Sequence, residues 1–94
     1  MWRVVEATGV QRQLKRAPKN VQEKYEFWRN VAELDGPTGL RRLPGFRDHA
    51  LKGEWRGARS SWLSRRWRVV YAVRGDELTV FVLEVNPHDY RKKN

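Results

Sequence analysis

The stretch WRVVYAVRGDELTVFVLEV, residues 67–85, carries the strongest structural signal in the chain. β-Branched and aromatic residues fill both of its halves, which predicts one strand over residues 67–73 and another over residues 77–85. Gly75 and Asp76 lie between them and are typical of a two-residue hairpin turn. The second strand is apolar on both faces from residue 78 to residue 85. We therefore expect it in the middle of a sheet that helices cover on at least one side.

Two further strands and two helices are predicted around this hairpin. Residues 58–63 and 2–6 have strand-like composition. One helix is predicted over residues 8–16, with Thr8 as its N-cap, and a second over residues 18–34, with Pro18 in its first turn. The second helix repeats apolar residues at spacings of four, three and four, which is typical of a core-facing stripe. Two Gly-Pro or Pro-Gly pairs predict that residues 35–46 form a loop.

The order β-α-α-β-β-β indicates a small α+β fold in which two N-terminal helices pack on a twisted, mainly antiparallel sheet. A chain of 94 residues is large enough for one modest core, so we expect residues 1–94 to form a single domain. No apolar stretch is long enough for a signal peptide or a membrane span, and a cytoplasmic protein is expected.

The charge balance favours polyanionic partners. The chain has 20 Lys and Arg against 11 Asp and Glu, a formal net charge of +9, which attracts nucleic acid, the ribosome or an acidic protein. The chain has no cysteine and only two histidines, which argues against disulfides, a zinc site or a metal enzyme, and no cofactor is predicted.

Cations and tryptophans alternate between residues 52 and 74. The cations are Lys52, Arg56, Arg59, Arg65, Arg66, Arg68 and Arg74, against a single Glu54 before the hairpin. Same-parity positions of a strand share a face, so Arg66, Arg68 and Arg74 are expected on one side and Val69, Tyr71 and Val73 on the other. Trp55, Trp62 and Trp67 among them suit base stacking, although Trp62 and Trp67 fit a core equally simply and are expected there. For Trp55 both interpretations stay open.

The two histidines have a chemical and a plain interpretation. His88 follows the last predicted strand and is next to Asp89 and Tyr90, where an imidazole that exchanges protons near pH 7 could act in catalysis. His49 and His88 could equally be solvated loop residues. No serine nucleophile elbow or phosphate-binding glycine loop is present, so a serine hydrolase or a nucleotide triphosphatase is not indicated.

The element order over nearly the whole chain, and residues 48–90 in detail, resemble the RelE/ParE superfamily of bacterial toxins from toxin–antitoxin pairs. The matching features are Leu51-Lys-Gly53, Arg59, Trp67-Arg-Val-Val-Tyr71, Gly75-Asp76, the Val-rich strand and the ending His-Asp-Tyr. The resemblance implies a RelE-like fold and metal-independent cleavage of messenger RNA on the ribosome, in which the ribose 2′-hydroxyl attacks the adjacent phosphate. It also leaves open a gyrase inhibitor of the ParE type, or a non-catalytic RNA-binding module.

The resemblance also implies roles for individual residues. His88 would be general acid or base, with Asp89 orienting it or facing solvent; Arg68 and Arg59 would hold the scissile phosphate, Tyr90 would orient the nucleotide, and Lys52 and His49 would support them. Further RNA contacts are expected from Arg56, Arg65, Arg66, Trp55, Arg91, Lys92 and Lys93. A histidine-rich subgroup carries another histidine and an aspartate where this chain has Trp62 and Arg66, so that subgroup's acid–base assignment does not transfer whole. The implied partners are a cognate antitoxin and the ribosome with its messenger RNA.

Overall fold

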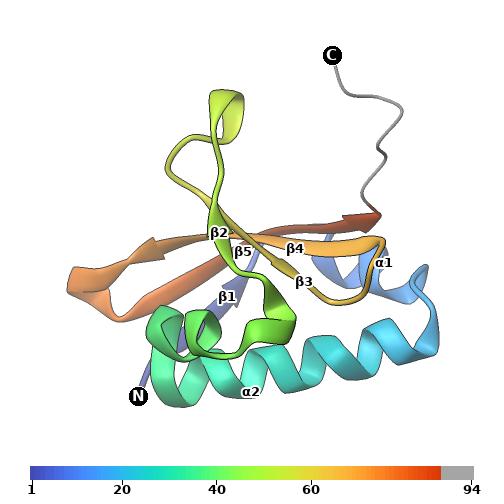
Figure 1. Cartoon of the computed structure of the whole chain (residues 1–94), viewed down its shortest axis with the longest axis horizontal. Coiled ribbons are helices and arrows are strands. Elements are labelled where there is room, and N and C mark those ends of the chain that lie inside the picture. The colour runs from blue at the N-terminus through green and yellow to red at the C-terminus, as the bar shows by residue number, and fades with distance from the viewer. Residues whose placement is uncertain (88–94) are drawn as a thin grey trace.

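The computed structural model describes residues 1–87 and shows two helices packed on one face of a five-stranded mixed sheet (Figure 1). The helices are α1 (Val10–Lys15) and α2 (Lys19–Arg42), and the strands are β1 (Arg3–Glu6), β2 (His49–Ala50), β3 (Arg59–Trp62), β4 (Trp67–Arg74) and β5 (Thr79–Pro87). Among these residues, no helix is both long enough and apolar enough to cross a bilayer.

The sheet has the order β1-β5-β4-β3-β2, with β1 parallel to β5 and every other pair antiparallel. β5 therefore lies inside the sheet, as its apolar composition predicts, and the α+β architecture is confirmed. The two-residue strand β2 at the far edge was not predicted, because a pair of residues leaves no periodic pattern to detect.

The core lies between the helices and the strand residues that point toward them. Val69 and Tyr71 of β4 are fully buried there, and Val73 packs against the same cluster, as the strand alternation predicts. Trp28 of α2 meets the edge of the Tyr71 ring with 5.4 Å between ring centroids, and Tyr25 stacks on Trp28 at 5.7 Å. The predicted apolar stripe of α2 is thus the face that covers the sheet.

The predicted loop over residues 35–46 is wrong, because helical structure continues to Arg42 after a break at Gly36. Gly36 has φ 66° and ψ −159°, a conformation that glycine adopts without a Cβ clash. Pro37 then begins the next helical run, where its missing N–H has no partner to lose. Gly36 also lies under the indole of Trp2: a Cβ there would be 2.4 Å from the Trp2 Cε2 atom.

Two local predictions at turns are also wrong. Thr8 does not cap α1: the N-cap is Gly9, with φ 100° and no side-chain cap bond. The β4–β5 turn is longer than two residues, since Arg74 pairs with Thr79 and a single 3₁₀ turn spans Gly75–Glu77. Leu78 closes this turn with φ 49° and is 46% exposed, so it is a turn residue instead of a buried strand residue.

An irregularity in β5 changes which residues face the core. Opposite Val70 and Tyr71 of β4 the partners are Glu84 and Val82, so the register shifts by one residue at this point. Val80 and Val82 are buried before the shift and Val85 after it. Glu84 and Asn86 consequently point to the other face of the sheet, although the sequence of β5 reads as apolar on both faces.

Candidate functional site

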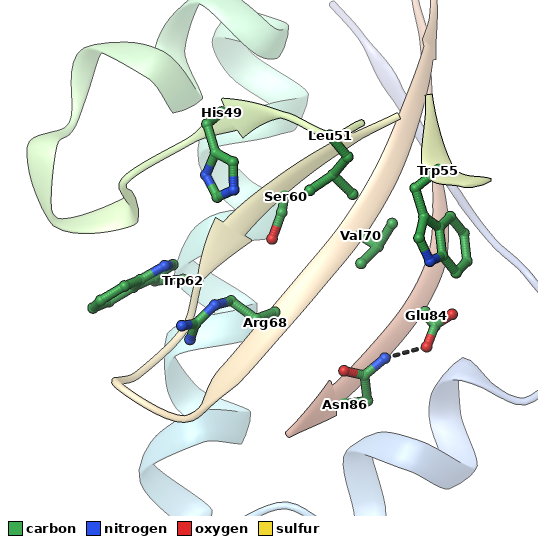
Figure 2. Close-up of a pocket in the computed structure, with 9 residues that line it drawn as sticks. All are labelled: His49, Leu51, Trp55, Ser60, Trp62, Arg68, Val70, Glu84 and Asn86. Atoms are coloured by element: carbon green, nitrogen blue, oxygen red, sulfur yellow. Dashed lines mark hydrogen bonds between the residues drawn. The ribbon is translucent and has the colours of Figure 1, made fainter. Parts of the chain in front are cut away.

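The candidate site is a pocket of about 470 Å³ on the sheet face opposite the helices (Figure 2). The strand registers arrange its floor as two rows that cross the sheet. One row joins His49, Ser60, Val70 and Glu84 from β2, β3, β4 and β5, and the other joins Trp62, Arg68 and Asn86 from β3, β4 and β5. Leu51 and Trp55 add the connection between β2 and β3, which rises from this face in Figure 1.

Arg68 is the most constrained cation of the pocket. The residue is only 7% exposed, and its Nη1 donates hydrogen bonds to the carbonyl oxygens of Ser64, at 3.2 Å, and Arg65, at 2.9 Å. Its Cζ lies 4.2 Å from the centroid of the Trp62 ring, a cation–π contact. The loop before β4 and the indole thus hold a permanent positive charge in one orientation beside an open pocket, an arrangement suited to a phosphate.

Trp62 does not belong to the core, and the prediction that placed it there is wrong. Arg47 also lies over its ring, with Cζ 4.5 Å from the centroid. The indole is shared between the first pocket and a second one of about 670 Å³, to which Lys24, Arg47 and Arg65 contribute cations. Trp62 therefore forms a wall between two cationic hollows. Trp67, by contrast, does pack against the core as predicted.

Arg59, predicted to hold the phosphate, is engaged elsewhere. Its Nε donates to Asp48 Oδ1 at 2.7 Å, while Ser61 Oγ and Tyr71 OH donate to Asp48 Oδ2 at 2.6 Å and 2.5 Å. The Asp48 side chain is fully buried. Burial raises the pKa of the Tyr71 phenol above its ordinary value and the Asp48 carboxylate raises it further, so the hydroxyl remains a donor. This polar cluster ties β2 to β3 and β4.

His49 lines the pocket from the edge strand, with its ring on the side of Ser60 and Trp62 (Figure 2). Its Nδ1 lies 2.8 Å from the carbonyl oxygen of Arg47. A carbonyl oxygen can only accept, so in this contact Nδ1 carries the proton. In the neutral ring Nε2 is then the nitrogen that can take up a proton from a substrate.

The remaining predicted residues divide by location. Trp55 lines the pocket and is 42% exposed, whereas Lys52 and Arg56 are exposed on the β2–β3 connection and do not line it. Arg65 and Arg66 line a neighbouring hollow. The predicted residues His88, Asp89, Tyr90, Arg91, Lys92 and Lys93 lie outside the described residues.

The expected row of Arg66, Arg68 and Arg74 on one strand face is not formed. Arg66 precedes the first residue of β4 and belongs to the turn before it. Arg74 is at the opposite end of the strand, where it forms an exposed ion pair with Glu77 at 3.5 Å. Only Arg68 of the three reaches the pocket.

Among the residues that line these two pockets, Lys24, Arg47, Ser60, Glu84 and Asn86 were not singled out from sequence. Glu84 could have been noticed in the sequence, because it is the only acidic residue of the Val-rich strand β5. Asn86 Nδ2 donates a hydrogen bond to Glu84 Oε1, as the dashed line in Figure 2 shows.

No family model and no curated protein sequence matches the chain. Several solved structures share its fold. The archaeal RelE–RelB complex of Pyrococcus horikoshii OT3 gives a TM-score of 0.75 with 22% identity over 95% of this chain and 97% of that one. The DinJ–YafQ toxin–antitoxin complex of Escherichia coli gives 0.73 with 18% identity over 94% of both chains. The YoeB/ParE toxin of Agrobacterium tumefaciens gives 0.69 with 20% identity over 93% and 99%.

Proposed function

We propose that this chain is a RelE/ParE-superfamily toxin of a toxin–antitoxin pair that cleaves messenger RNA in the decoding site of the ribosome. The observation that carries the proposal is Arg68, a buried guanidinium stacked on Trp62 at the edge of an open pocket. The shared fold of the RelE, YafQ and YoeB/ParE structures and the net charge of +9 support it.

In this proposal Arg68 holds the scissile phosphate. The hydrogen bonds from its Nη1 to two backbone carbonyl oxygens, together with the Trp62 ring, fix the guanidinium before RNA binds. Little reorganisation is then needed when negative charge builds up in the transition state. Trp62 offers a face on which a base can stack, and the second hollow, with Arg47 and Arg65, continues the cationic path for the RNA backbone.

The proposed reaction is an internal transfer of the phosphoryl group. A base removes the proton of the ribose 2′-hydroxyl, whose oxygen attacks the adjacent phosphorus; the bond to the 5′-oxygen of the next nucleotide breaks, and an acid protonates that oxygen. The products are a 2′,3′-cyclic phosphate and a 5′-hydroxyl. We assign His49, through Nε2, as a proton-transfer group of this reaction.

The residues after β5 complete the proposed site. His88 follows Pro87, the last residue of β5, in the sequence, and we assign it as the second acid–base group with Tyr90 orienting the nucleotide, on the resemblance to ribosome-dependent toxins. The exposed Lys52 and Arg56 are assigned to contacts with ribosomal RNA.

A cognate antitoxin is the proposed protein partner, because the RelE–RelB and DinJ–YafQ structures are complexes. An acidic segment of the antitoxin would cover the cationic hollows around Trp62, and the association rate would fall with added salt. The ribosome as target places the proposed activity in the cytoplasm.

The test compares two arginines of the same strand. Arg68→Ala should lower the rate of messenger RNA cleavage in a translating extract by about a hundredfold or more, as for loss of a preorganised charge-stabilising donor. Arg74→Ala removes an equal charge from the exposed far end of β4 and should leave the rate unchanged. Circular dichroism checks that both variants fold. Equal rates for Arg68→Ala and wild type would refute the assignment, and intact messenger RNA with inhibited gyrase supercoiling would favour the ParE-type activity.

A further inference from the structure

The pocket has two chemically different ends (Figure 2). His49, Trp62 and Arg68 form a cationic end that suits a phosphate. The other part of the lining includes Trp55 from the β2–β3 connection and Glu84 and Asn86 of β5, where the polar groups are a carboxylate and an amide. A phosphate is repelled by this second end, which suits a group that donates hydrogen bonds.

Glu84 is an unusual group for a pocket of a strongly basic protein. Asn86 donates to its Oε1, and within residues 1–87 no Lys or Arg forms an ion pair with it. A carboxylate only accepts hydrogen bonds, so Glu84 selects a ligand group that donates them. Trp55, with 42% of its surface exposed, adds a flat apolar face to the lining of the same pocket.

We infer that Glu84 reads a nucleobase, and that its preferred base is guanine; this inference rests on the proposed function. Guanine alone among the four RNA bases presents two adjacent donors, N1–H and N2–H, on its Watson–Crick edge, and these match the two oxygens of a carboxylate. Adenine and cytosine place a ring-nitrogen acceptor next to their amino group, and the single N–H of uracil lies between two carbonyl oxygens. These acceptors repel the carboxylate.

The spacing of the two ends fits one nucleotide or two successive ones. Arg68 is paired with Asn86 of β5, and Glu84 lies two residues before Asn86 on that strand. Arg68 and Glu84 are therefore diagonal neighbours, with Cβ atoms about 7 Å apart. The Arg68 guanidinium leans toward Trp62 and away from Glu84 (Figure 2). A phosphate on Arg68 and a base on Glu84 therefore belong to neighbouring parts of the bound RNA.

Glu84→Gln is the informative variant, because glutamine has nearly the same shape and still accepts the hydrogen bond from Asn86. In a translating extract, wild-type cleavage should favour codons with guanine at one fixed position relative to the cut. Glu84→Gln should reduce the guanine-to-adenine cleavage ratio by about fivefold to a hundredfold, the range expected for one bidentate base contact. Glu77→Gln removes the same charge from the β4–β5 turn and should leave the ratio unchanged.

Two results would overturn the inference. One is a Glu84→Gln variant that cleaves all codons faster by the same factor, since that shows general repulsion of RNA without base reading. The other is an unchanged ratio.

Binding separates this inference from the proposed nuclease activity. Fluorescent trinucleotides that contain guanine or adenine should show the same loss of discrimination in Glu84→Gln, measured by anisotropy without cleavage. If messenger RNA stays intact but this binding ratio falls, base reading holds and the nuclease proposal fails. If wild type binds both trinucleotides equally, base reading by Glu84 fails.

Discussion

Replacing Asp48 should lower the free energy of unfolding, because its side chain is the shared acceptor of a buried polar cluster. Its carboxylate is fully buried and accepts hydrogen bonds from Arg59, Ser61 and Tyr71 at 2.5–2.7 Å. Asp48→Ala deletes both acceptor oxygens, and with them all three hydrogen bonds, and leaves the Arg59 guanidinium without its partner. These bonds hold the edge strand β2, which carries His49, against the rest of the sheet, so their loss should weaken the attachment of β2.

The expected loss follows from the burial of each partner. Removing one member of a buried ion pair costs about 3–5 kcal/mol, because the other charge stays behind uncompensated. The Arg59 side chain is 23% exposed and keeps part of its hydration, which places the expected loss near the lower end, about 3 kcal/mol. Ser61→Ala removes a single hydroxyl donor, and its expected loss is about 1 kcal/mol.

Guanidinium chloride unfolding of the variants, followed by tryptophan fluorescence, measures these losses in the free energy of unfolding. The dependence of that free energy on denaturant concentration should be the same for every variant. Glu77→Ala is the control, because it breaks an exposed ion pair and should change the free energy of unfolding by less than about 0.5 kcal/mol. If Asp48→Ala lost under about 1 kcal/mol, the buried cluster would not be holding β2 in place.

Two further predictions concern the helix break and the buried phenols. Gly36→Ala should lower the free energy of unfolding by about 2 kcal/mol or more, since the new methyl clashes with Trp2 at a positive φ, whereas Gly45→Ala, which has open space, should change it by under about 0.5 kcal/mol; denaturant titration checks both. The pKa values of Tyr25 and Tyr71 are raised by burial and by the carboxylates they bond, so the folded state keeps protons that the unfolded chain releases above about pH 10. The free energy of unfolding should therefore fall as pH rises above 10, by about 1.4 kcal/mol per pH unit for each tyrosine, and Tyr71→Phe should remove its share of that slope.

The elements that sequence predicted well are those whose packing repeats along the chain. β4 and β5 are rich in β-branched residues and α2 has a regular apolar stripe, so burial on one face of each leaves a periodic trace. Features that depend on one residue were missed. The shift in β5 that turns Glu84 to the pocket has no local signature, because the valines on either side satisfy both possible phases.

Part of the site was predicted, through the resemblance to a known family. The resemblance matched Arg68 to an arginine before the Val-Val-Tyr core of a strand and His49 to a histidine of a related subgroup, and the pocket brings the two together. Two other residues lie differently from their predictions: Arg59 bonds the buried Asp48, and the indole of Trp62 lies against the guanidinium groups of Arg47 and Arg68. These side-chain contacts join residues that are distant in the sequence, so the periodicity of apolar residues along the chain does not predict them.

Mapping the ends of messenger RNA in a translating extract tests the central claim most directly. Purified protein should produce new 5′ ends inside codons of translated messages, with 5′-hydroxyl and 2′,3′-cyclic phosphate termini. The same RNA without ribosomes should stay intact. Full-length messenger RNA on programmed ribosomes, at protein concentrations equal to those of the ribosomes, would contradict the account.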